Sequence, residues 1–187
     1  REWPQALAWG AAVLTSVLLS LAYGRWLAPK LAQRDPTIRS IGTLGFAEPT
    51  DLVDRTPQPM TIDGVDFVFQ YVPDSEAPAE LAFYLPAKRA YCSAELANHT
   101  MHNLYTLRGA KVRDALEWSG YIDEAIRLFG GAEVYFGSHH WPLWGNARIR
   151  EFLQKQRDTY RYIHDQTLRM ASLGHTPQQI ADELVLP

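Results

Sequence analysis

Residues 59–73 read PMTIDGVDFVFQYVP, and this stretch decides the fold class of the chain. Asp63-Gly64 stands between two β-rich runs, and glycine supplies the positive φ that a tight hairpin turn requires. Every second residue of the run after the turn is apolar or aromatic, which places these side chains on one face of a strand. The residues of that face are Val65, Phe67, Phe69 and Tyr71. The stretch therefore predicts a β-hairpin.

Further short strands follow the hairpin. Leu81–Leu85 and Arg89–Ala94 are predicted strands, and Pro86–Lys88 between them is a predicted turn. The tight connections favour antiparallel pairing of these strands. Another strand is predicted over Ala132–Ser138.

Two longer segments carry a helical pattern. Apolar residues recur at i, i+3 and i+4 over residues 118–129, and Gly130-Gly131 follows as the helix end. A long helix is predicted over Asn146–Leu173, with Gly174 as its stop. Residues 176–179, TPQQ, then have the order of a capping box with proline at the first helical position. Strands mixed with helices predict an α/β fold.

The composition excludes several classes of protein. Of 187 residues, 18 are Lys or Arg and 21 are Asp or Glu, so the formal net charge is −3. This balance argues against a nucleic-acid partner, which usually requires a strongly basic face. The single cysteine, Cys92, excludes an intrachain disulfide and a multi-cysteine zinc module, and an inert core thiol is its favoured interpretation.

The segment Ala6–Leu27 has two interpretations. No charge lies between Glu2 and Arg25, and the segment is long enough to span a bilayer. Its many small residues also suit a helix buried in a larger α/β protein, which is the favoured interpretation. Contact with a membrane through this segment stays open.

Candidate metal ligands follow the predicted strands. Glu76 lies in the loop after the hairpin, Glu95 closes the next strand pair, and His139 and His140 close the strand at 132–138. Groups at strand ends converge on one rim in α/β folds. Carboxylates with imidazole are suitable ligands for zinc or another divalent ion, although a single glutamate at a strand end is more often solvated or a cap.

A second group of polar residues lies in His99–Asp114, HTMHNLYTLRGAKVRD. Its arginines, with Asn103 and Tyr105, suit an oxyanion site, because guanidinium binds sulfate, phosphate or carboxylate in bidentate fashion. The alternative is a solvated basic loop that pairs with nearby acids. His99 and His102 could chelate a metal from a helix, but a structural role in the loop is favoured. Trp141 and Trp144 line an apolar pocket or pack its rim.

Four runs together resemble a known family: PDSEAPAELAFYLPAKRAYCSAE, HTMHNLYTLRGAKVRDALEW, SHHWPLWGN and QRDTYRYIHDQTLRM. They are similar to the alkyl sulfatases of the metallo-β-lactamase superfamily, which hydrolyse dodecyl sulfate. The resemblance extends roughly over residues 49–187. It implies an αββα sandwich, of which residues 49–145 are the C-terminal half and residues 146–187 the start of a helical dimerisation region. Residues 1–48 match only weakly.

The resemblance also implies a binuclear zinc centre. Glu76 and Glu95 correspond to two carboxylate ligands, and the histidine ligand falls on His139 or His140, with His139 favoured. The sulfate-binding residues of the family correspond to Asn103, Leu104, Tyr105, Thr106, Leu107, Arg108 and Arg113. The general acid is not identified. A homodimer and export to the periplasm or medium are further expectations from the family.

One departure from the family is large. The HxHxDH motif, which opens the metal site of the superfamily, is absent from the 187 residues. We expect the chain, which begins with Arg1, to be a piece truncated at both ends and to have little or no activity alone. A hydrolase of another ester anion and a non-catalytic, membrane-associated remnant are the alternative interpretations.

Overall fold

The computed structural model describes residues 49–106, 109 and 111–186. The predicted apolar segment Ala6–Leu27 lies outside these residues. The chain from residue 51 onward forms its own compact unit. Within the described part, no helix combines the length and the apolar character that crossing a membrane would require.

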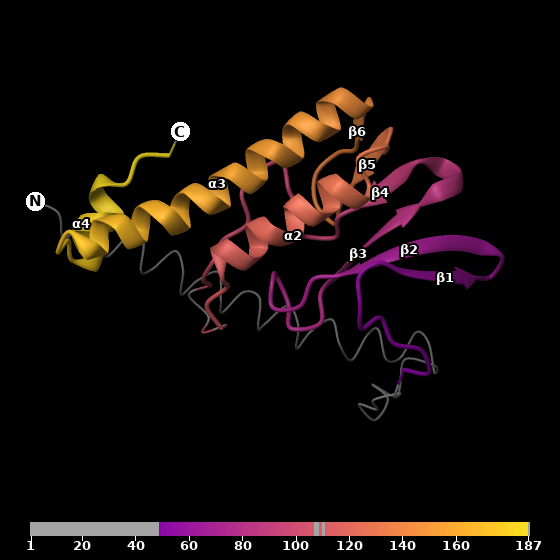
Figure 1. Ribbon diagram of the computed structural model, residues 1–187, viewed down its shortest axis with the longest axis horizontal. Coiled ribbons are helices and arrows are strands. Elements are labelled where there is room, and N and C mark those ends of the chain that lie inside the picture. The colour runs from indigo at the N-terminus through magenta and orange to yellow at the C-terminus, as the bar shows by residue number, and fades with distance from the viewer. Residues whose placement is uncertain (1–48, 107–108, 110, 187) are drawn as a thin grey trace, which may run out of the picture. The chain divides into compact units, whose positions relative to one another are not determined.

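A mixed sheet forms the first layer of this unit (Figure 1). Its strands are β1 (Gln58–Ile62), β2 (Val65–Tyr71), β3 (Leu81–Leu85), β4 (Ala90–Cys92), β5 (Val134–Phe136) and β6 (Leu143–Trp144), in that spatial order. All neighbours pair antiparallel except β4 and β5, which are parallel. A parallel pair needs a long crossover, and here the crossover contains a helix.

The hairpin between β1 and β2 forms as predicted. Asp63 and Gly64 both have positive φ, 51° and 79°, and Ile62 pairs with Val65 across the turn. This two-residue loop matches the right-handed twist of the strands. The predicted strands at 89–94 and 132–138 are confirmed in shorter form as β4 and β5. The predicted turn at Pro86–Lys88 is the short 3-10 helix η2.

Three helices follow the predicted boundaries closely. In α2 (Ala115–Leu128), the Asp114 carboxylate caps the first turn by accepting from the backbone N–H groups of Leu116 and Glu117. The long helix α3 (Asn146–Ser172) and the short helix α4 (Pro177–Glu183) complete the described fold. The capping box that opens α4 is present, with Thr176 and Gln179 as partners.

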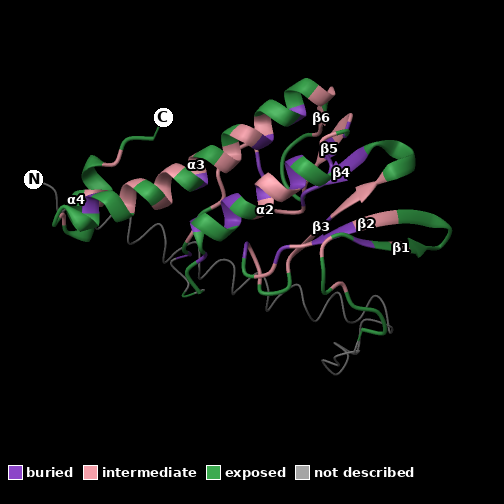
Figure 2. Ribbon diagram, in the orientation of Figure 1, coloured by how far each residue is buried: buried purple, intermediate pink, exposed green. Residues whose placement is uncertain are grey.

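The two faces of the sheet differ. One face packs against α2 and α3 and contains the core residues Val72, Ala82, Tyr91 and Tyr135 together with Trp118 and Ile122 of α2 and Ile149 and Leu153 of α3. The opposite alternation of the strands brings four phenylalanines together: the rings of Phe67, Phe69 and Phe83 contact one another, and Phe136 contacts Phe83. Figure 2 shows buried residues along β4, at the end of β2 and in parts of α2 and α3.

The helices α2 and α3 lie side by side (Figure 1) and make the most extensive contact between elements of the described chain. Arg157 of α3 pairs with Asp123 of α2 at 2.9 Å. The helix α3 begins at Asn146, where the sequence places the start of a helical region. The assignment of residues 146–187 to a separate dimerisation domain stays a prediction.

Candidate metal and anion site

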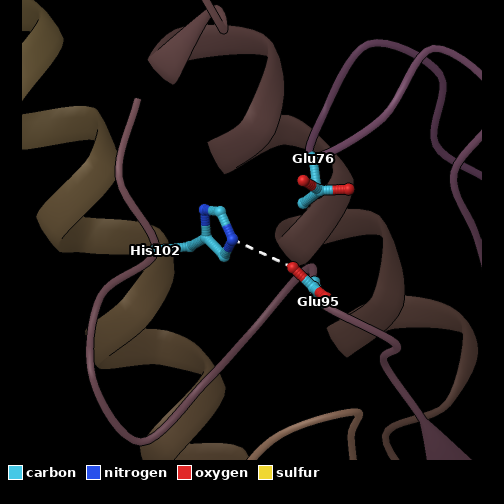
Figure 3. Close-up of side chains that lie close together, drawn as sticks. All are labelled: Glu76, Glu95 and His102. Atoms are coloured by element: carbon cyan, nitrogen blue, oxygen red, sulfur yellow. Dashed lines mark ion pairs between the residues drawn. The ribbon is translucent and has the colours of Figure 1, made fainter. Parts of the chain in front are cut away.

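Three side chains from separate segments meet beside α2 (Figure 3). One donor atom each from Glu76, Glu95 and His102 lies within 4.8 Å of the others. His102 Nε2 is 2.9 Å from Glu95 Oε2. Two carboxylates with one imidazole are a donor set that a divalent metal such as zinc accepts. In the described part of the chain, this is the group of acidic and histidine residues with the geometry of a metal site.

The local sequence explains why these groups converge. Glu76 lies in the loop that follows β2, and Glu95 follows β4. These two strands flank β3 and run in the same direction, so both residues lie beyond the same end of the sheet. The Ser75 hydroxyl donates to the Val72 carbonyl at 2.7 Å and fixes the turn before Glu76. Ala94 has a φ of 49°, a left-handed conformation that turns the chain directly before Glu95.

Arg113 links Glu76 of this site to Asn103, which lies in the loop at residues 99–106. Its Nη2 donates to Glu76 Oε1 at 2.7 Å, and its Nε donates to the Glu76 backbone carbonyl at 3.0 Å. Its Nη1 donates to both the backbone carbonyl and Oδ1 of Asn103, each at 2.8 Å. The side chain is only 5% exposed. It is a buried cation with hydrogen-bonded anionic and amide partners, as a buried charge requires.

His102 is held by both helices. The Tyr160 hydroxyl of α3 accepts from the His102 backbone N–H at 3.1 Å and donates to its carbonyl at 3.2 Å. Tyr160 stacks on Trp118 of α2, with ring centroids 4.9 Å apart, and the His102 ring lies 5.7 Å from Trp118. Trp118 Nε1 donates to the Leu96 carbonyl at 2.7 Å and so anchors the loop after Glu95.

The two expected histidine ligands differ in position. His139 Nε2 lies 3.1 Å from Glu95 Oε1, so this imidazole contacts the site through Glu95. His140 Nε2 lies 3.2 Å from the Thr100 hydroxyl, and its backbone has a φ of 67°. Glu95 therefore stands between two imidazoles, His102 on one carboxylate oxygen and His139 on the other. The assignment of His139 or His140 as a metal ligand stays a prediction.

Glu80 is a third carboxylate in this region. Its Oε1 accepts from the backbone N–H of Glu95 at 3.2 Å. Burial raises the pKa of Glu80, the hydrogen bond from Glu95 lowers it, and the negative charges of Glu76 and Glu95 raise it further. A concentration of negative charge that burial already penalises is typical of a site that receives a cation.

The residues expected to bind sulfate lie on the segment that Arg113 holds. The Leu104 carbonyl accepts from the Arg113 backbone N–H at 2.9 Å, and the Thr106 carbonyl accepts from Gly109 at 3.1 Å. Tyr105 is 49% exposed. Leu107 and Arg108 lie outside the described residues. The Thr106 hydroxyl is buried and makes no hydrogen bond within the part of the chain that the structure describes.

The structure also places the other residues that the sequence singled out. Residues 99–106 form a loop, so the helical chelate of His99 and His102 does not form; His99 Nε2 instead contacts the Trp141 carbonyl at 2.9 Å. Cys92 is buried in β4. Trp141 and Trp144 are 66% and 60% exposed, so neither side chain lines a closed pocket.

Sequence reasoning did not select His102 as a site residue. Its signal was weak, because it follows no strand and its spacing from His99 suggested a helix. The contact that places it comes from Tyr160, 58 residues further along the chain. The adjacent Asn103, which was selected, was the available signal for this position.

Comparison with known proteins finds solved structures of similar fold and enzymes of similar sequence. No family model matches the chain. The fold resembles that of a metallo-β-lactamase family protein from Thermus thermophilus, with a TM-score of 0.50 at 17% identity over 66% of this chain and 39% of that one. The described part therefore has the fold of one part of a metallo-β-lactamase-type protein, as expected.

The nearer similarities are to alkylsulfatases. A linear primary-alkylsulfatase from Pseudomonas sp. is 46% identical over 173 residues, which are 90% of this chain and 26% of that protein. An alkyl/aryl-sulfatase from Saccharomyces cerevisiae is 49% identical over 149 residues, 79% of this chain and 23% of its own length. The structure of an inverting sec-alkylsulfatase from Pseudomonas sp. matches with a TM-score of 0.73 at 39% identity, over 75% of this chain and 22% of that one.

These matches confirm the resemblance to the alkylsulfatases that the sequence motifs indicated. The chain spans about a quarter of the length of the curated relatives it matches. It therefore corresponds to one segment of those proteins.

Proposed function

We propose that the protein carrying this chain hydrolyses alkyl sulfate esters to an alcohol and sulfate. The observation that carries the proposal is the convergence of Glu76, Glu95 and His102, within 4.8 Å, beside a loop fixed by Arg113. The names of the similar proteins, which are alkylsulfatases, support the choice of substrate.

The carboxylates of Glu76 and Glu95 would bind zinc, together with an imidazole. The donor set fits this metal, because zinc sites commonly combine histidine nitrogen with carboxylate oxygen. His102 and His139 both contact Glu95, whereas His140 contacts the Thr100 hydroxyl. A binuclear centre needs more ligands than this chain's described residues offer, and the absent HxHxDH motif would be the source of those ligands.

The segment that begins at Asn103, called the anion loop from here on, would receive the sulfate group. Asn103 stands next to His102, and Tyr105 and Arg108 follow on the same segment. A sulfate ester is a permanent anion, and amide, hydroxyl and guanidinium donors match its oxygens. Arg113 would hold this loop against Glu76.

The chain's own residues would then divide the work of hydrolysis. Glu76 and Glu95 would hold the metal, and zinc bound there would supply a water of lowered pKa as the nucleophile. The loop orients the ester beside these carboxylates. If His139 or His140 is the metal ligand, His102 keeps its contact with the other carboxylate oxygen of Glu95, at 2.9 Å, and orients that carboxylate.

A chimera tests this proposal. The matching segment of the Pseudomonas linear primary-alkylsulfatase is replaced by this chain, and release of sulfate from dodecyl sulfate is measured. We expect the chimera to be active, and Glu95→Gln to reduce its rate by at least about 10-fold. Glu151→Gln, at an exposed carboxylate of α3, is the matched control and should leave the rate unchanged.

A folded chimera without sulfatase activity would contradict the proposal, as would an active chimera that tolerates Glu95→Gln. Activity on a phosphate or carboxylic ester in place of the sulfate would favour another ester anion as the substrate. The 187-residue chain tested alone is expected to show little or no turnover.

Three broader features are proposed from the family alone. The intact protein would be a homodimer that uses the region of α3 and α4. It would be periplasmic or secreted. Membrane contact through Ala6–Leu27 would be an additional feature, which fractionation with carbonate extraction tests directly.

A further inference from the structure

We infer that Arg113 is a positioning residue, which fixes Glu76 of the metal site and Asn103 of the anion loop in one arrangement. The inference rests on the proposed function only for the roles given to those two partners. The contacts that define it belong to the chain itself.

The donors of Arg113 are already used inside the protein. Its Nε and Nη2 bond to Glu76, and both hydrogens of Nη1 are directed at Asn103. All but one of the guanidinium N–H groups therefore have a partner. The side chain is only 5% exposed, so these contacts are made inside the protein.

The geometry joins two segments that do not otherwise share a strand or helix. Glu76 is 37 residues before Arg113, and Asn103 is 10 residues before it. Arg113 binds a backbone carbonyl and a side chain on each of them, so both the position and the orientation of each residue are fixed. A planar guanidinium can hold such a fork, whereas the ammonium of lysine cannot.

Charge gives the same residue a second effect. Glu80 Oε1 accepts from the backbone N–H of Glu95 at 3.2 Å, so the three acidic residues Glu76, Glu80 and Glu95 lie in one region. Among the arginines and lysines that the structure describes, Arg113 is the one that contacts this group, through Glu76 Oε1 at 2.7 Å. Its guanidinium also lies 6.0 Å from the centre of the Trp118 ring, which favours a cation at this position.

Hydrogen–deuterium exchange of the metal-free 187-residue chain tests the inference without any bound ion. Arg113→Lys keeps the charge and removes the fork. We expect several-fold faster exchange in two peptides at once, residues 73–81 and residues 99–106. Lys111→Gln is the matched control, because Lys111 lies on the same loop, is exposed, and pairs with Asp74 instead.

Faster exchange in neither peptide, or in one of them only, would overturn the inference. Asn103→Ala covers the case in which Arg113→Lys does not fold. It removes the Asn103 Oδ1 acceptor and leaves the contacts with Glu76, so it should speed exchange in residues 99–106 alone. Unchanged exchange there would overturn the inference equally.

A second readout is the affinity for Co²⁺, followed by its visible absorption. We expect Arg113→Lys to weaken binding about 10- to 100-fold, the range for partners that orient metal ligands, and Lys111→Gln to leave it unchanged. Equal affinity in the Arg113→Lys variant and the wild type would overturn the inference. A wild-type chain that binds no Co²⁺ would instead count against the proposed function, and the exchange experiment would still decide the role of Arg113.

Discussion

The hydroxyl of Tyr160 holds the backbone of His102 on both sides, by accepting from its N–H at 3.1 Å and donating to its carbonyl at 3.2 Å. Tyr160 is fully buried on α3, and His102 lies in the loop that carries the candidate site. The long helix therefore sets the position of the imidazole. This relationship makes α3 part of the site's support and not only a neighbour of the sheet.

Replacing Tyr160 with phenylalanine tests this support. The ring and its stacking on Trp118 remain, but two backbone groups of His102 lose their partner. Leaving buried polar groups unsatisfied costs about 1–3 kcal/mol, so we expect the free energy of unfolding to fall by that amount. Urea denaturation measures it. Tyr162→Phe is the control, and a loss of equal size in both variants would remove the special role of the Tyr160 hydroxyl.

Gly130 marks the place where α2 ends against the start of α3. A Cβ added there would lie 2.6 Å from the Ile126 carbonyl oxygen and 2.9 Å from Arg150 Nη2. We expect Gly130→Ala to destabilise the chain by about 1–3 kcal/mol, the usual cost of overpacking. Gly131→Ala meets no atom within 4 Å and should be neutral or slightly stabilising. Equal midpoints in thermal unfolding for the two variants would contradict the packing described here.

Cys92 is expected to be unreactive in the folded chain. Burial raises the pKa of its thiol, so less of the reactive thiolate is present at pH 8 than in a free cysteine. Raising the pH should speed the reaction while leaving it slower than in the unfolded chain. With Ellman's reagent, we expect a rate lower by on the order of tenfold or more before denaturation, and one thiol per chain afterwards. Rapid reaction of the folded chain would show that β4 is accessible.

Alanine substitutions distinguish the imidazoles around Glu95. His102 and His139 contact its two carboxylate oxygens, at 2.9 and 3.1 Å. We expect loss of the ligand imidazole to weaken Zn²⁺ binding at least about 10-fold, whereas His164→Ala, at an imidazole that pairs with Asp165 on α3, should have no effect. Isothermal titration calorimetry compares the three alanine variants at His102, His139 and His140. If none of them weakens binding, the metal is held elsewhere.

The secondary structure was predictable because local signals decide it. Asp63-Gly64 specifies the hairpin turn through its positive φ, and the TPQQ sequence specifies the start of α4 through its capping box. The strand β6 was not predicted, because two residues are too few for a period-two pattern to be detected. Its position depends on pairing with β5, a contact that only the folded chain provides.

The site was predictable in part. Strand ends and the family motifs indicated Glu76, Glu95 and the loop at Asn103. The orientation of Arg113 toward Glu76 was not predictable from spacing, because the two residues lie 37 positions apart and more than one acid was available to the arginine. His102 depends on the same kind of distant contact, through Tyr160.

We propose that Glu76 and Glu95 hold a divalent metal ion, and a count of bound zinc tests this. The 187-residue chain is stripped with a chelator, zinc is added back, and bound metal is counted for the wild type, Glu76→Gln and Glu95→Gln. We expect no more than one ion per chain, held weakly because the described donors form only part of a binuclear site, and lost in both variants. Absence of binding, or binding that both variants retain, would contradict it.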